Sequence, residues 1–398
     1  MPSSVTQHLR PSLDSLIAVT PQSNNINPQQ NLTEARPLSL RDKLNQEFVI
    51  DRLKNVDGGT GPGPLVVELD PTTICNLACH DCISANLLNQ GGFSNDRLMQ
   101  LAGEFHQAGV RAVVLIGGGE PMAHPKFGDI VRSLTDMGIQ VGVTTNGTLI
   151  SKFMEESAMT KWLRVSVDAG SAEVFSEFRP HRSGRSQFDL VIKNMANLAK
   201  IKTGLLGYSF LLLSKFSASH ELVSTNAIDI AKAANVARDI GCDYFEVKPA
   251  FDLMHYLQRQ DDKVVQIVNE QLNSIRELAS DDFKIIAPTT LQEALRGSEG
   301  QPKDYKSCPT TNLRTVVTPS GVYVCPYHRG NLQMKIGDAV ATSFVEIWTG
   351  KRRSDVMANL NPSKHCGFHC IRHESNLFLF ELENGSLPTP VSDYDRFI

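Results

Sequence analysis

The chain has 398 residues, of which 41% are hydrophobic and 21% are charged, and its formal net charge at pH 7 is −4. These ordinary values give no electrostatic reason to expect nucleic acid or an anionic membrane as a partner. No apolar run approaches the roughly 18 residues that a membrane-spanning helix needs, and the amino-terminal residues lack the basic region and apolar stretch of a secretory signal. We therefore expect a cytoplasmic protein.

The amino-terminal arm, residues 1–60, is rich in Ser, Pro, Asn and Gln as far as residue 38. Such a composition buries too little apolar surface to offset the entropy of ordering, so most of the arm is expected to be disordered. Apolar residues recur at helical spacing over residues 39–55, which predicts one short amphipathic helix there.

Residues 61–295 alternate between apolar, β-rich runs and amphipathic helical patterns. Strands are predicted over 65–70, 112–121, 140–148, 163–171, 205–214 and 244–251, with a further β-rich run at 283–288. Helices are predicted over 96–108, 125–137, 187–202, 223–240 and 262–279. Six strand–helix units without a dinucleotide-binding glycine pattern favour an α/β fold, a partial (β/α)6 barrel of the TIM type. Functional residues of such a barrel lie at the carboxyl ends of its strands.

A different pattern begins near residue 300 and predicts a small second domain over 300–375. Residues 314–327 form two β-rich runs around Pro319, Ser320 and Gly321, which is typical of a hairpin. A short helix is expected near 343–358, and residues 376–398 are left as a carboxyl-terminal tail.

Seven of the eight cysteines fall into two groups, and Cys242, which stands apart, is interpreted as a small buried hydrophobe. The first group is Cys75, Cys79 and Cys82, directly after the first predicted strand. A zinc site usually takes four ligands as two close pairs, and here only three thiols are crowded together. Three thiolates suit a [4Fe–4S] cluster that leaves one iron without a protein ligand.

The CxxxCxxC spacing after the first strand resembles the radical S-adenosylmethionine (radical SAM) superfamily. In that family the open iron binds S-adenosylmethionine, whose reductive cleavage gives a 5′-deoxyadenosyl radical that abstracts a substrate hydrogen. "GGGEP" (117–121) resembles the family's turn for the cofactor's amino group, "TTNGT" (144–148) a motif of the third strand, and "SVDAGS" (166–171) the ribose contact of the fourth. The resemblance implies cofactor-binding roles for Gly118, Gly119, Glu120, Pro121, Thr145, Asn146, Ser166 and Asp168, and for Arg179 as partner of the methionine carboxylate.

The second group is Cys308, Cys325, Cys366 and Cys370, set around the predicted hairpin. Zinc is the alternative here, because four thiolates are a common structural zinc site, and His328, His365 or His369 could also ligate. The segment resembles the carboxyl-terminal auxiliary-cluster domain of radical SAM enzymes, in its four-cysteine twitch form rather than its seven-cysteine SPASM form. The resemblance implies a second [4Fe–4S] cluster.

The resemblance to twitch dehydrogenases, with no peptide-binding module in view, favours an oxidoreductase for a small hydroxyl-rich substrate such as a sugar, nucleotide sugar or aminocyclitol. A ribosomally made peptide is the alternative substrate, and a non-catalytic metal-binding scaffold is a third reading. Lys215, Lys248 and Asp252 are the candidate catalytic residues, with His181 and Arg182 as further substrate anchors. An external one-electron donor such as flavodoxin or ferredoxin is expected.

Overall fold

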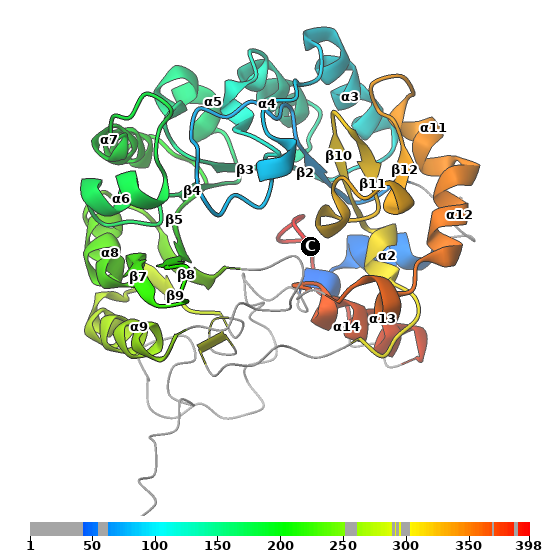
Figure 1. Cartoon of the computed structure of the whole chain (residues 1–398). Coiled ribbons are helices and arrows are strands. Elements are labelled where there is room, and N and C mark those ends of the chain that lie inside the picture. Colours follow the sequence, from blue (N-terminus) through cyan, green and yellow to red (C-terminus); the bar gives the residue numbers. More distant parts are fainter. Residues whose placement is uncertain are drawn as a thin grey trace, which may run out of the picture.

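A curved sheet of ten strands organises the protein, in the order β12-β11-β10-β1-β2-β3-β4-β5-β8-β9 (Figure 1). The computed structural model describes residues 43–54, 63–250, 261–288, 291, 294–295, 303–367, 370–385 and 389–398. The following strands pair in parallel, each with the next in this order: β1 (Val66–Leu69), β2 (Ala112–Leu115), β3 (Gln140–Thr145), β4 (Trp162–Ser166), β5 (Leu205–Leu212), β8 (Tyr244–Pro249) and β9 (Lys284–Ile286). The first six are the strands predicted from the sequence, and the α/β barrel-like fold is confirmed.

Helices cover the outside of this sheet (Figure 1). They are α3 (Asn95–Gln107), α4 (Phe127–Asp136), α5 (Met154–Ala158), α6 (Ala172–Phe178), α7 (Phe188–Ala199), α8 (Ile230–Asp239) and α9 (Asp262–Ser274). Helix α3 has the amphipathic pattern that predicts a surface helix, because Leu98, Leu101 and Phe105 form one fully buried face. The Ser94 side chain caps this helix by accepting a hydrogen bond from the Arg97 amide.

The helix predicted over 223–240 is wrong in its first part. Residues Leu222–Thr225 form strand β7, which pairs antiparallel with β6 (Ser214–Phe216), and α8 begins only at Ile230. The local sequence explains the difference, since Val223 and Thr225 are β-branched and favour a strand. The Thr225 hydroxyl then caps the short 3-10 turn that precedes α8.

The predicted hairpin joins the main sheet. Strand β10 (Arg314–Thr318) pairs in parallel with β1, and β11 (Gly321–Tyr323) and β12 (Lys335–Gly337) follow it antiparallel. No local pattern predicted this pairing, which continues one hydrogen-bonded sheet through both predicted domains. Helices α11 (Phe344–Thr349), α12 (Lys351–Asn359), α13 (Pro362–His365) and α14 (His373–Glu383) complete this region. The division of the chain at residues 60, 295, 300 and 375 stays a prediction.

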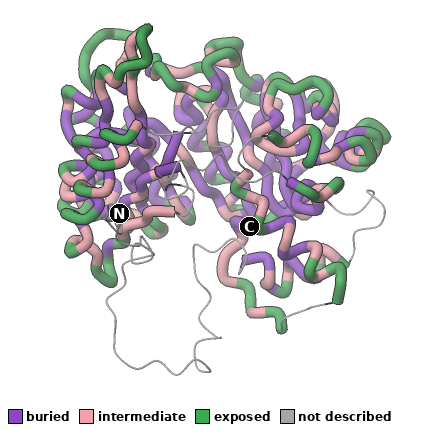
Figure 2. Tube along the Cα trace, turned by 60° about the horizontal axis from the view of Figure 1, so that its bottom comes forward, coloured by how far each residue is buried: buried purple, intermediate pink, exposed green. Residues whose placement is uncertain are grey.

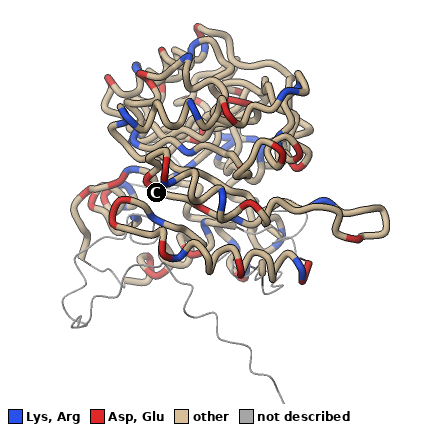
Figure 3. Tube along the Cα trace, turned by 90° about the vertical axis from the view of Figure 1, so that its left-hand side faces the viewer, with Lys and Arg blue, Asp and Glu red and all other residues tan. Residues whose placement is uncertain are grey.

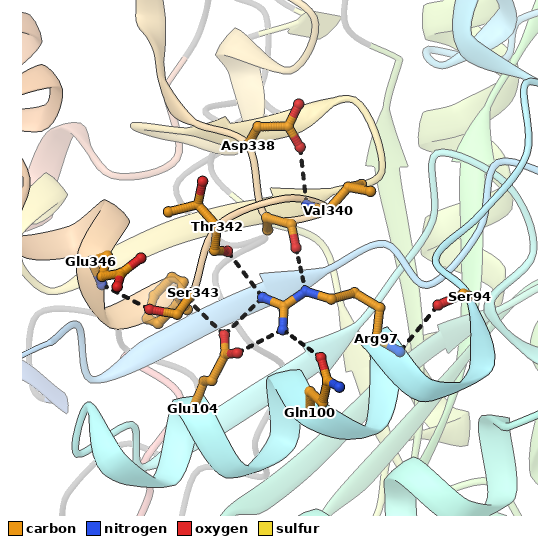
Figure 4. A network of polar contacts seen from close by, with 11 residues as sticks. Ser94, Arg97, Gln100, Glu104, Asp338, Val340, Thr342, Ser343 and Glu346 are labelled. Atoms are coloured by element: carbon orange, nitrogen blue, oxygen red, sulfur yellow. Dashed lines mark hydrogen bonds and ion pairs between the residues drawn. The ribbon is translucent and has the colours of Figure 1, made fainter.

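A polar clamp fixes the carboxyl-terminal region onto α3 (Figure 4). The Arg97 guanidinium binds both carboxylate oxygens of Glu104, at 2.6 and 2.9 Å, and also donates to the carbonyl oxygens of Ala339 and Thr342. Glu104 in turn accepts a hydrogen bond of 2.7 Å from the Phe344 amide. Beneath this clamp the Phe105 and Phe344 rings meet edge to face, 5.0 Å apart.

Alternate residues along each strand face either the helices or the interior of the curved sheet. At the amino-terminal ends of the strands the interior is filled by apolar side chains from both ends of the chain. Leu44 and Val49, near and within α2 (Glu47–Lys54), pack there with Phe397 and Ile398. The Phe397 ring lies 5.3 Å from the Trp162 ring on β4. Figure 2 shows buried residues through the middle of the molecule and exposed residues mainly on its outer turns.

The predicted arm and tail are only partly within the described residues. Residues 1–42 and 55–62 lie outside them, so the expected disorder of the arm stays a prediction. Residues 389–398 are not a loose appendage, since Gln46 binds the backbone of Tyr394 and Asp395. Among the described helices, none is long and apolar enough to cross a membrane.

Candidate functional site

The first three cysteines lie in the loop that follows β1, and all three are partly exposed. The segment after α6 holds this loop in place. The Ala78 amide donates to the Pro180 carbonyl at 2.8 Å, and the Arg182 side chain donates to the Cys75 carbonyl at 3.1 Å. Leu77 and His181 also form an antiparallel bridge. His181 and Arg182, expected as substrate anchors, therefore serve the backbone of the cysteine loop in this structure.

The "GGGEP" turn after β2 packs directly against the start of that loop. A Cβ atom on Gly119 would lie 2.4–2.6 Å from backbone atoms of Thr73 and Ile74, so only glycine fits this approach. The Glu120 amide donates to the Ile74 carbonyl at 2.9 Å. Gly118 lies beside Asp70, and Pro121 begins the short 3-10 turn that follows. The sequence motif is thus a physical neighbour of the cysteines.

The Glu120 carboxylate is buried and joins its own turn to the end of β3. It accepts hydrogen bonds from the Thr145 hydroxyl at 2.7 Å, the Asn146 amide at 2.7 Å and the Met122 amide at 3.1 Å. Burial raises the pKa of Glu120, and these three donors oppose the rise. Asn146 extends the link to the cysteine loop, because its side-chain amide donates to the Asn76 side chain at 2.8 Å.

A second buried acid, Asp168, follows β4 and pairs with Arg179. The Arg179 Nε atom donates to Asp168 Oδ2 at 2.6 Å, and Asp168 Oδ1 accepts from the Leu211 amide at 2.7 Å. The other side of the guanidinium faces the cysteine loop, with Nη1 at 3.9 Å from Cys79 Sγ. Asp168 has a positive φ of 57°, which turns the chain inward after β4. Ser166, the last residue of β4, lies two residues before it and is partly exposed.

The three thiols and these two acids meet at one end of the sheet. Burial raises the pKa of Cys75 to about 11 and also raises that of Cys79, where the Arg179 charge opposes the rise. Thiolates at these positions therefore need a compensating cation, and a bound metal supplies one because it deprotonates a coordinating thiol outright. The donor set fits an iron–sulfur cluster with three protein ligands.

The second cysteine group assembles from three separate segments. Burial raises the pKa of Cys325 well above its ordinary value, and the nearby thiols Cys308, Cys366 and Cys370 raise it further. The Asn376 side chain on α14 lies 3.4 Å from Cys308 Sγ and accepts hydrogen bonds from the amide and hydroxyl of Thr310.

Histidines stand near this group as well. His328 Nε2 lies 3.5 Å from Cys366 Sγ, whereas His365 Nδ1 accepts a hydrogen bond from the Asn361 amide. His369 lies outside the described residues. Within the described part of the chain, no three His, Cys, Asp or Glu side chains converge as a single metal ion would require.

Two of the three candidate catalytic residues lie within the described part of the chain. Lys215 lies on β6, where its amine donates to the Glu177 carbonyl and stands 5.1 Å from the centre of the Phe178 ring. Lys248 lies on β8 and faces the interior of the sheet, 3.2 Å from Glu246. Asp252 lies outside the described residues. The catalytic assignments stay predictions.

Two ion pairs near the site were not predicted from the sequence. Arg329, four residues after Cys325, binds both carboxylate oxygens of Asp70 at 2.6 and 3.0 Å, and so joins the end of β1 to the second cysteine group. Arg164 and Glu246 face each other across the interior of the sheet. The signal for the second feature was present, because charged residues alternate with apolar ones in "WLRVS" and "YFEVKP".

A comparison with known protein families matches the part of the chain that contains the first cysteine group. A family profile described as the radical SAM superfamily matches residues 69–213, which hold the three cysteines, Glu120, Asp168 and Arg179. The chain therefore contains a radical SAM domain over residues 69–213. Such a domain implies a [4Fe–4S] cluster and S-adenosylmethionine, and the cysteine loop described above suits both.

Individual relatives extend the likeness beyond this span. The mycofactocin maturase MftC of Mycobacterium tuberculosis is 26% identical over 273 residues, or 66% of this chain and 65% of that protein. The AdoMet-dependent heme synthase of Methanosarcina barkeri is 31% identical over 121 residues, covering 29% of this chain and 34% of that protein. The crystal structure of Streptococcus suis SuiB bound to precursor peptide SuiA superimposes with a TM-score of 0.56 at 18% identity, covering 77% of this chain and 69% of that one. The chain thus spans slightly less than two thirds of MftC, and the SuiB likeness concerns the fold.

Proposed function

We propose that this radical SAM enzyme modifies a peptide substrate. The observation that carries the enzymatic part is the meeting of the cysteine loop, Glu120 and the Asp168–Arg179 pair at one end of the sheet. The peptide part is supported by the relatives, since MftC is named a maturase and SuiB was solved with a precursor peptide. The small hydroxyl-rich substrate expected from the sequence has no support among these relatives.

Each part of the site has a role in this proposal. Cys75, Cys79 and Cys82 hold the cluster, which, when bound, supplies the electron that cleaves S-adenosylmethionine. Glu120 accepts a hydrogen bond from the cofactor's amino group, beside the close backbone approach that Gly118 and Gly119 allow. Thr145, Asn146 and Pro121 fix the Glu120 carboxylate and its turn. Arg179 binds the methionine carboxylate, and Ser166 and Asp168 bind the ribose.

The second group is proposed to hold an auxiliary [4Fe–4S] cluster rather than zinc. A cubane carries its ligands on separate irons, so its thiolates stand farther apart than those around one zinc ion. The other three thiols lie close enough to raise the pKa of Cys325, and the segment resembles the four-cysteine auxiliary-cluster domain. An oxidative outcome, a flavodoxin- or ferredoxin-like electron donor and a cytoplasmic location belong to the same proposal.

Anaerobic reconstitution followed by a cleavage assay tests the enzyme. We expect about eight irons per chain, and the reduced protein should convert S-adenosylmethionine to 5′-deoxyadenosine. Co-expression with short peptides encoded beside its gene should then change the mass of one peptide. Four irons with one zinc would contradict the auxiliary cluster. Turnover of free sugars or aminocyclitols, with every such peptide unchanged, would contradict the peptide substrate.

A further inference from the structure

Three charged side chains face the interior of the sheet near the proposed cofactor site: Arg164 on β4, and Glu246 and Lys248 on β8. We call them the inner cluster. Arg164 Nη1 lies 3.6 Å and Lys248 Nζ lies 3.2 Å from the same oxygen of Glu246. One carboxylate thus serves two cations, and the cluster carries a net charge of about +1 at neutral pH.

The Arg164 guanidinium is incompletely hydrogen-bonded. Its Nε atom is buried and has no hydrogen-bond partner among the described residues, although a guanidinium carries five N–H donors. Nη2 reaches the Thr144 hydroxyl at a long 3.4 Å. Leaving such donors unpaired away from water costs free energy. The arrangement therefore favours an additional acceptor beside Arg164.

The inner cluster is partly exposed. The side chains of Arg164 and Lys248 are 29% and 23% exposed, although both strands lie within the sheet. At the amino-terminal ends of the strands, by contrast, Trp162, Phe397 and Ile398 pack together. The exposed part of the inner cluster can therefore meet an additional acceptor.

The other charged groups at this place are already paired. Asp168, the nearest further acid, binds Arg179. Lys248 is in register with Leu211, whose amide binds Asp168, so it lies beside the proposed cofactor site. Burial and the Arg164 charge lower the pKa of Lys248 to about 8, and Glu246 opposes this shift. A second negative group would balance the cluster.

We propose that Arg164 and Lys248 form a carboxylate-binding subsite that anchors the substrate inside the sheet, next to the proposed cofactor site. A planar carboxylate matches the guanidinium fork and the nearby ammonium group. The inference rests on the proposed function, because it supplies the substrate class of the same site, a peptide with an acidic side chain or a free terminal carboxylate. The competing reading is a self-contained ionic network that binds nothing.

The chain contains its own reporter for this subsite. The Arg164 Cζ atom lies 5.9 Å from the centre of the Trp162 ring. The chain has two tryptophans, so in the Trp348→Phe variant Trp162 is the only source of tryptophan fluorescence. Three matched probes would be titrated into the reconstituted Trp348→Phe enzyme: N-acetylglutamate α-amide, N-acetylglutamine with a free α-carboxylate, and the neutral N-acetylglutamine amide. We expect saturable binding of at least one acid and none of the neutral probe. The preferred acid identifies the source of the carboxylate.

Variants decide between the two readings. Arg164→Gln and Lys248→Gln should each raise Kd for the acid at least tenfold, while Arg238→Gln, an exposed arginine paired with Asp239, should leave it unchanged. Unchanged iron content and an unchanged far-UV circular dichroism spectrum in both variants show that the fold persists. Equal responses to all three probes, or unchanged affinity in both variants, would overturn the subsite.

The two proposals can fail separately. Selective acid binding by a chain that modifies no peptide would support the subsite and contradict the peptide substrate. Modification of a peptide that carries no carboxylate, at an undiminished rate, would overturn the subsite and leave the peptide proposal standing.

Discussion

The two cysteine groups are built in opposite ways. Residues 75–82 supply the first group from one loop, and their neighbours hold that loop by backbone hydrogen bonds. The second group draws its thiols from residues 308, 325, 366 and 370, which meet only because β10 joins the main sheet and α14 packs behind Cys308. One loop therefore brings the thiols of the first group together, although distant segments hold that loop, whereas the thiols of the second group meet only through tertiary packing of the carboxyl-terminal region.

Single cysteine substitutions should separate the two groups most strongly. Cys79→Ala removes a ligand of the proposed open-iron cluster, so cleavage of S-adenosylmethionine should fall more than about 100-fold, to background. Cys325→Ala should keep 5′-deoxyadenosine formation within about threefold of wild type but abolish peptide modification. Both are measured by chromatography of the reduced, reconstituted proteins. Equal loss of cleavage in the two variants would break the comparison.

The same difference explains what the sequence could predict. The spacing of Cys75, Cys79 and Cys82, and the turn that ends at Glu120, are local patterns and were found directly. The pairing of β10 with β1 links residues 314–318 to 66–69, and no local periodicity encodes such a contact. Arg329 lay unnoticed for the same reason, because its partner Asp70 is 259 residues away.

The clamp between Arg97 and Glu104 holds the two regions together, so breaking it should affect mainly the second group. The two side chains are 12% and 16% exposed, and Arg97→Met would leave Glu104 partly buried without its cation. We expect a loss of about 2 kcal/mol in the free energy of unfolding, below the range for fully buried pairs. Denaturant titration at 25 °C measures it.

The matched control for the clamp is Arg132→Met. Arg132 also pairs with glutamates, but its side chain is 46% exposed, so the loss should stay below about 1 kcal/mol. Iron analysis completes the test: Arg97→Met should lower occupancy of the second group before the first. An equal decrease in both groups would show that the clamp serves the whole fold.

The smallest effect should come from the contact behind Cys308. Asn376 is 1% exposed, and Asn376→Leu would remove the acceptor of two hydrogen bonds from Thr310 and the amide beside Cys308 Sγ. Because the Thr310 amide then loses its partner, we expect about 1–2 kcal/mol less stability and faster loss of the second cluster's iron to a chelator. Asn359→Leu, on the exposed end of α12, is the control that should change neither quantity by much. Cleavage of S-adenosylmethionine should survive in both variants, since no contact of Asn376 reaches the loop of Cys75. If Asn376→Leu instead abolished cleavage, the second group would govern the first, and the independence of the locally built site would be wrong.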